Sequence, residues 1–163
     1  MMKNPYLELD EINLQLLDLL QQDATLSNQD LAERVHVSPP TCLRRIKRLQ
    51  DSGLIERQVA ILRPERVAAL VGYGLQAVVE ITLERQGAEL LDAFEARAVQ
   101  DSAVQQCWRV SPGPDFVLIT HTRDMPGYLA LTQRLFTNDA NVRNVRAFFS
   151  TRRAKFNPRI PLV

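Results

Sequence analysis

The chain has 163 residues, of which 45% are apolar and 24% are charged, and its 20 Lys and Arg residues nearly balance 19 Asp and Glu. This composition is typical of a globular protein with one large or two small domains. No run approaches the ~18 to 20 apolar residues of a membrane helix, the first ten residues lack the apolar core of a signal peptide, and two cysteines are too few for a disulfide framework or a zinc site. We therefore expect a cytoplasmic protein with no membrane partner, metal or cofactor.

The net charge of +1 hides a strong local asymmetry. Residues 1–38 carry two cations and seven acids, a net charge of −5, whereas residues 39–63 carry six cations and two acids, a net charge of +4. Because a polyanion is attracted by a basic surface and not by the protein average, segment 39–63 indicates nucleic acid as a partner. The last 23 residues hold six cations and no acid. For them we expect a solvated tail, with DNA or a neighbouring protomer as the alternative contacts.

Two helix-start signals occur in the acidic segment. Leu9–Gln22 has apolar residues at helical spacing after Asp10, which is a suitable N-cap. Ser27 and Asp30 form a variant of the capping box and open a second, shorter helix that continues through Val35.

A third helix follows after a turn of three residues. Ser38 is placed to cap it, and Pro39 occupies the first helical position, where its missing N–H is harmless. The helix continues to about Ser52, and Gly53 is suited to a left-handed C-terminal cap. His36, in the turn, is interpreted as a residue that tolerates positive φ and not as a ligand. Two helices joined in this way predict a helix-turn-helix, in which the later helix is the recognition helix.

The segment after the recognition helix predicts the limits of a first domain. Residues 54–62 are expected to form a small β-ribbon, or wing, and residues 64–72 a linker with room for one helical turn. We therefore assign residues 1–62 to a winged helix-turn-helix DNA-binding domain and residues 63–72 to the linker.

From residue 73 the apolar period changes from helical to alternating. The pattern predicts strand, helix, strand, strand, helix, strand, at residues 75–83, 88–99, 104–111, 116–122, 125–136 and 142–151. This order is the ferredoxin-like split βαβ arrangement. The fold class is therefore α+β, with a second domain over residues 73–163.

One face of the predicted sheet needs a cover. Both helices of a ferredoxin-like domain lie on the same face, yet residues 116–119 and 147–149 are apolar at consecutive positions. An exposed apolar surface of this kind typically marks an interface. We expect a homodimer formed through the two sheets.

The recognition helix holds the candidate DNA-binding residues. Cys42, Ile46 and Leu49 fall on one side and pack inward, whereas the basic side chains are expected outward, and Lys47 is assigned to a backbone contact. Arginine suits both guanine edges and phosphate oxygens. A merely solvated basic face is the alternative. The predicted DNA-binding residues are Ser38, Pro40, Thr41, Arg44, Arg45, Lys47, Arg48 and Arg57.

These residues resemble a known family. Segment 31–49, read as LAERVHVSPPTCLRRIKRL, with the Gly-Leu-Ile of 53–55 and the GLQAVVEITL of 74–83, is similar to the Lrp/AsnC (leucine-responsive, feast/famine) transcriptional regulators. The resemblance covers nearly the whole chain. It implies a ferredoxin-like βαββαβ (RAM-type) effector-binding and oligomerisation domain, dimers that assemble into octamers, and control by a small molecule, usually an amino acid.

The family's effector turn is altered here. Members carry Gly-x-x-Asp between the second and third strands, and this chain has Ser111-Pro-Gly-Pro-Asp115, with Pro112 where the glycine is expected. The resemblance assigns effector binding to Ser111, Gly113 and Asp115. Asp115 either receives a ligand ammonium group or caps the turn. Because proline removes an amide donor, an effector-independent DNA-organising protein or constitutive repressor is the alternative function.

An enzyme is not expected. The sequence shows no nucleophile and base pairing, phosphate-binding loop or acid pair that suggests a reaction. The prediction is a sequence-specific transcriptional regulator that binds double-stranded DNA and responds to a small molecule.

Overall fold

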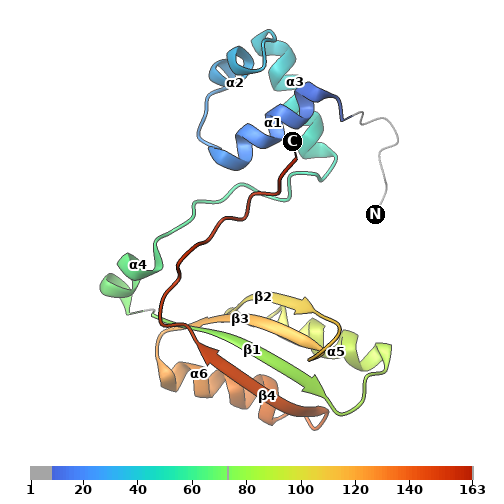
Figure 1. Cartoon of the computed structure of the whole chain (residues 1–163), viewed down its shortest axis with the longest axis vertical. Helices are drawn as coiled ribbons and strands as arrows, with labels where there is room; N and C mark the ends of the chain where they lie inside the picture. Colours follow the sequence, from blue (N-terminus) through green and yellow to red (C-terminus); the bar gives the residue numbers. More distant parts are fainter. Residues whose placement is uncertain (1–8, 73, 163) are drawn as a thin grey trace. The chain divides into compact units, whose positions relative to one another are not determined.

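The computed structural model describes residues 9–72 and 74–162, and the chain divides into two compact units (Figure 1). One unit comprises residues up to Ile61 together with the C-terminal segment from Lys155, and the other comprises Leu62–Ala154. The expected limits at residues 1, 73 and 163 lie outside the described residues. Within the described residues, the segment from 155 to 162 groups by its contacts with the first unit, whereas the sequence analysis placed it in the second domain.

Three helices build the first unit, at Glu11–Gln22 (α1), Asn28–Arg34 (α2) and Pro39–Asp51 (α3). Asp10 caps α1 by accepting a hydrogen bond from the Asn13 N–H at 2.8 Å. At α2 the Ser27 hydroxyl accepts from the Asp30 N–H at 3.1 Å, and the Asp30 carboxylate accepts from the Ser27 N–H at 3.2 Å. The reciprocal capping box predicted for α2 is thus confirmed.

The turn and the ends of α3 follow the expected backbone with one exception. His36 has φ 55° and Gly53 has φ 77°, so both adopt the left-handed conformation predicted for them. Ser38 is the N-cap residue of α3, but its side chain makes no capping bond. Its hydroxyl lies 2.9 Å from the Thr41 hydroxyl instead.

The core of the first unit is small and lies between the three helices. Leu16, Cys42 and Leu49 are completely buried, with Leu31, Ala32 and Val35 beside them. The predicted β-ribbon after α3 is absent: residues 56–63 are described and contain neither helix nor strand. A ribbon requires a second strand to form its ladder, and the described residues of this unit contain none.

The expected linker is mostly helical. Pro64–Val71 (α4) has eight residues, more than the single turn expected, and it ends at Gly72 with φ 75°. Pro64 is suited to the first helical turn and Gly72 to the left-handed cap. Neither α4 nor any other described helix has the length and apolar character needed to cross a membrane.

The second unit is an antiparallel sheet with helices on one face. The strands are Leu75–Leu83 (β1), Val104–Arg109 (β2), Phe116–Thr122 (β3) and Val142–Phe149 (β4), in the order β2-β3-β1-β4. The helices are Ala88–Ala98 (α5) and Met125–Thr132 (α6), which continues as a π-helical turn over Gln133–Thr137. This confirms the ferredoxin-like βαββαβ fold. Strands β2 and β4 each end two residues before the predicted limit.

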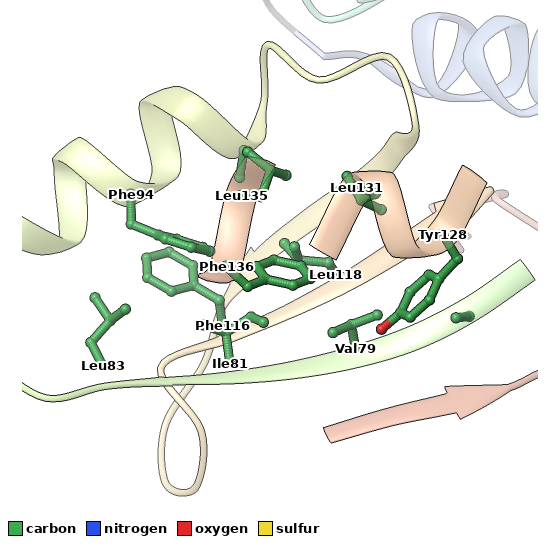
Figure 2. Close-up of a cluster of buried hydrophobic side chains, with 12 residues drawn as sticks. Val79, Ile81, Leu83, Phe94, Phe116, Leu118, Tyr128, Leu131, Leu135 and Phe136 are labelled. Atoms are coloured by element: carbon green, nitrogen blue, oxygen red, sulfur yellow. The ribbon is translucent and has the colours of Figure 1, made fainter. Parts of the chain in front are cut away.

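Alternate residues of the strands form the core beneath α5 and α6 (Figure 2). Val79 and Ile81 of β1 are completely buried, and the Phe94 and Phe116 rings lie 4.8 Å apart between centroids. The Tyr128 ring of α6 meets Phe149 edge-on at 5.0 Å.

The opposite face of the sheet carries the apolar side chains that the sequence predicted, among polar ones such as Glu80 and Arg146. Val78 of β1 lies between its register partners Ile119 of β3 and Phe148 of β4. Trp108, which pairs with Val117, is 58% exposed, and Phe148 is 46% exposed. We refer to Val78, Trp108, Val117, Ile119 and Phe148 as the apolar sheet face.

Candidate nucleic-acid interface

The outward side of α3 carries three cations. Arg44, Lys47 and Arg48 are exposed, while Cys42 and Leu49 on the inward side are fully buried. Because the inward side packs against the core, the opposite side of the helix faces solvent. We call Arg44, Lys47 and Arg48 the exposed basic face of α3.

Arg45 does not lie on this face, contrary to the prediction. Its side chain is 24% exposed and bridges to the start of α1, where Nη1 donates to Asp10 Oδ2 at 2.7 Å and to Asn13 Oδ1 at 2.9 Å. The pKa of the Asp10 carboxyl lies below its ordinary value because it accepts from the Asn13 N–H and from Arg45. Arg45 therefore links α3 to α1.

The remaining predicted residues lie around the start of α3 and after its end. Ser38 and Pro40 are exposed, and Thr41 is half-buried. Arg57 is exposed in the segment after α3, with Nε 3.5 Å from Glu56 Oε1. An exposed pair at this distance contributes little to stability, so the Arg57 guanidinium can exchange Glu56 for another anion.

Leu43 is a residue that the sequence interpretation left out. It is 60% exposed on α3, three positions after Pro40 and four before Lys47. Those spacings place neighbours on one side of a helix, so the signal was present in the sequence.

The candidate effector turn is tied into the sheet of the second unit. Asp115 Oδ2 accepts from the buried Leu83 N–H at 2.7 Å, and the Asp115 N–H donates to the Ile81 carbonyl at 2.8 Å. Ser111 and Gly113 are exposed, and Gly113 has φ 124°. One carboxylate oxygen of Asp115 therefore supports the turn, as the turn-capping interpretation requires.

A shallow pocket of about 190 Å³ lies at the other end of the sheet, where β1 begins and β3 ends. Its walls include Gln76, His121 and Arg152. The turn at residues 111–115 adjoins Ile81 and Leu83, near the end of β1. The predicted effector residues therefore do not line this pocket.

Two family models together match most of the chain. Residues 9–56 match a winged helix-turn-helix DNA-binding domain, and residues 76–160 match an Lrp/AsnC ligand-binding domain. A leucine-responsive regulatory protein of Rhizobium meliloti is 34% identical, over 91% of this chain and 92% of the relative. The DNA-binding transcriptional activator DecR of Escherichia coli K12 is 33% identical, over 94% of this chain and 99% of the relative.

Solved structures agree with these matches. A transcriptional regulator from Neisseria meningitidis in complex with L-Met is 28% identical, covers 95% of this chain and 97% of its own, and has a TM-score of 0.83. An AsnC family transcriptional regulator from Agrobacterium tumefaciens is 29% identical in sequence. The match covers 94% of this chain and 97% of the regulator, with a TM-score of 0.82.

A helix-turn-helix unit with a basic recognition helix, followed by a ferredoxin-like unit of the ligand-binding type, defines an effector-responsive DNA-binding transcriptional regulator. The chain belongs to the Lrp/AsnC family. Its family and relatives are transcription regulators and not enzymes.

Proposed function

We propose that the exposed basic face of α3 reads specific sequences of double-stranded DNA in the cytoplasm. The observation that carries this proposal is the outward direction of Arg44, Lys47 and Arg48 beside the buried Cys42 and Leu49. Arginine can donate two parallel hydrogen bonds to guanine, whereas lysine is a compact charge suited to phosphate. Ser38, Pro40, Thr41 and Arg57 flank this face as further contacts, and Arg45 holds the recognition helix against α1.

The test compares DNA affinity among single variants. Duplexes selected from a random library by the wild-type protein serve as probes. Arg44→Ala should weaken binding by ~1 to 3 kcal/mol and relax one base preference, whereas Lys47→Ala should weaken all sequences alike and lower the salt slope by about one. Arg85→Ala, an exposed arginine of the second unit, is the matched control. Wild-type affinity and selectivity in an Arg44 and Lys47 double variant would contradict the proposal.

We propose a homodimer, which the apolar sheet face supports, and octamers as the larger assembly, which only the family resemblance implies. Burying Trp108 and Phe148 against a second copy would remove from water the largest exposed apolar side chains of this face. A symmetric dimer would present two α3 helices to half-sites about 34 to 36 Å apart or a multiple of that distance. Ile119→Glu, at the centre of the face, should give a folded monomer in analytical ultracentrifugation. An unchanged dimer would place the interface elsewhere.

The effector is proposed to be an amino acid, bound near Ser111, Gly113 and Asp115. The match to an Lrp/AsnC ligand-binding domain and the likeness to a regulator solved with L-Met support this proposal. Asp115 Oδ1 is the carboxylate oxygen not used by the Leu83 amide, and it can accept from an ammonium group. Calorimetric titration with each amino acid should show one that binds and that changes DNA affinity or assembly.

The altered turn favours a second candidate function. Pro112 offers no amide to a ligand carboxylate, and Asp115 is already engaged with the sheet. These observations support a DNA-organising protein or constitutive repressor that acts without an effector. Absence of a calorimetric response to every amino acid, with intact DNA binding, would select this alternative.

A further inference from the structure

Leu43 is an apolar side chain that α3 does not use in its own unit. Cys42 and Leu49 are fully buried, and Ile46 packs against the same core, whereas Leu43 is 60% exposed. It lies in the N-terminal half of α3, which spans Pro39–Asp51. In helix-turn-helix proteins, this half of the recognition helix contacts base edges.

The neighbours of Leu43 restrict what it can contact. The exposed Pro40 lies three positions before it, and the cations Arg44 and Lys47 lie beside it and one turn later. A protein interface typically needs a broad apolar patch, and a strip of two apolar residues bordered by cations does not provide one. A polyanion with a small apolar feature fits this surface better. In the major groove of DNA, that feature is the C5-methyl group of thymine.

We propose that Leu43 is a specificity-determining residue that contacts a thymine methyl group in each half-site, with Arg44 and Lys47 beside it on neighbouring base edges and phosphates. This inference rests on the proposed DNA-reading role of α3. The contact favours thymine over cytosine and uracil at one position, because only thymine offers the methyl group.

The experiment removes the two contacting groups separately and together. In the duplex selected by the wild-type protein, each thymine is replaced in turn by deoxyuridine, which lacks only the methyl group. Wild type, Leu43→Ala and Leu43→Met are titrated against every duplex at one salt concentration. Leu129→Ala, which truncates a leucine of α6 that is 59% exposed, is the matched control. Because Leu43 is exposed, Leu43→Ala should keep the wild-type thermal midpoint, and this is measured first.

For the wild type, deoxyuridine at one thymine per half-site should weaken binding about four-fold, the loss expected for one buried methyl group. This loss of affinity on replacing thymine by deoxyuridine should disappear in Leu43→Ala and persist in Leu43→Met and Leu129→Ala. A penalty that persists in Leu43→Ala, or a wild type that is indifferent to every substitution, would overturn the thymine contact while leaving DNA binding intact. Failure of the wild type to select any duplex would instead overturn the proposed function itself.

Discussion

The two units use their apolar residues differently, and this determines where each one can bind. In the first unit, the buried residues lie between three short helices, so the outward side of α3 carries its cations, with Leu43 exposed among them. In the second unit, apolar residues occupy both faces of the sheet, with Val79 beneath the helices and Val78 on the uncovered face. Burial identifies the outward side of α3 directly, but in the sheet it distinguishes only a covered face from an open one.

The units also differ in how their stability is built. The second unit buries twelve residues in one cluster, including several aromatic rings (Figure 2). The first buries six in its cluster and adds polar links at the helix ends, such as the Ser27 and Asp30 capping box and the Arg45 and Asp10 ion pair. Truncation of a core side chain should therefore lower the free energy of unfolding most in the second unit. Removal of a polar link should lower the free energy of unfolding of the first unit.

The largest effect is expected for Phe116→Ala. This ring is fully buried against Phe94, and the Arg109 guanidinium lies 5.6 Å from its centroid. Truncation should lower the free energy of unfolding of the second unit by about 3 to 5 kcal/mol. Calorimetry should show the transition of this unit moving downward while that of the first unit stays in place. A common shift of both transitions would show that the two units unfold together.

The second largest effect on stability is expected for Arg45→Ala, in comparison with its neighbour Arg44. Arg45→Ala should destabilise the first unit by about 2 to 3 kcal/mol, because Asp10 and the buried Asn13 lose charge-assisted hydrogen bonds. Arg44→Ala should change the stability by less than about 0.5 kcal/mol, since the side chain is exposed. Urea unfolding measures both. Equal stability losses would mean that the ion pair across α1 and α3 contributes nothing specific.

Much of the first unit could be predicted because its signals are local. The N-cap at Asp10, the capping box at Ser27 and the positive φ of His36 and Gly53 each depend on residues within a few positions. The position of Arg45 could not be predicted in this way. A helical projection groups it with Arg44, but its side chain reaches Asp10, 35 positions earlier, and such a contact exists only after the helices pack.

The errors in the rest of the chain have similar physical causes. The sheet order follows from the order of alternating segments, which is a strong signal. The wing was expected over residues 54–62, yet a strand needs a partner to satisfy its backbone, and none is present among the described residues of that unit. For Asp115 the sequence left a ligand role and a turn-capping role open, and its bond to Leu83 could not be predicted because it depends on the register of two strands.

Asp115→Ala tests whether Asp115 stabilises the second unit. It should lower the unfolding free energy by about 1 to 2 kcal/mol, because the Leu83 N–H is left without its acceptor. Asp115→Asn keeps an oxygen acceptor and should recover most of this loss. Calorimetric titration of Asp115→Asn with an amino acid that binds the wild type separates the roles. If Asp115→Asn still binds the amino acid, the role of Asp115 is to support the turn and not to bind the ligand.

The smallest effect is expected at the C-terminal segment, which was predicted as a solvated tail. Arg159 Nη2 lies 2.7 Å from Asp18 Oδ1 on α1, and Ile160 exchanges two hydrogen bonds with the Gln21 side chain, at 2.7 and 3.1 Å. Arg159→Ala should lower the stability of the first unit by less than about 1 kcal/mol, because a partly exposed ion pair gains little over hydration. The loss should shrink as salt is raised, since screening already weakens the pair.

Arg152→Ala, an exposed arginine of the preceding segment, is the control for the charge itself. It should leave the melting of the first unit unchanged at both low and high salt. If Arg159→Ala and Arg152→Ala shift the transition equally, the effect belongs to the overall charge and the segment is a solvated tail after all. If only Arg159→Ala acts, and only at low salt, the contact with Asp18 holds this segment against α1.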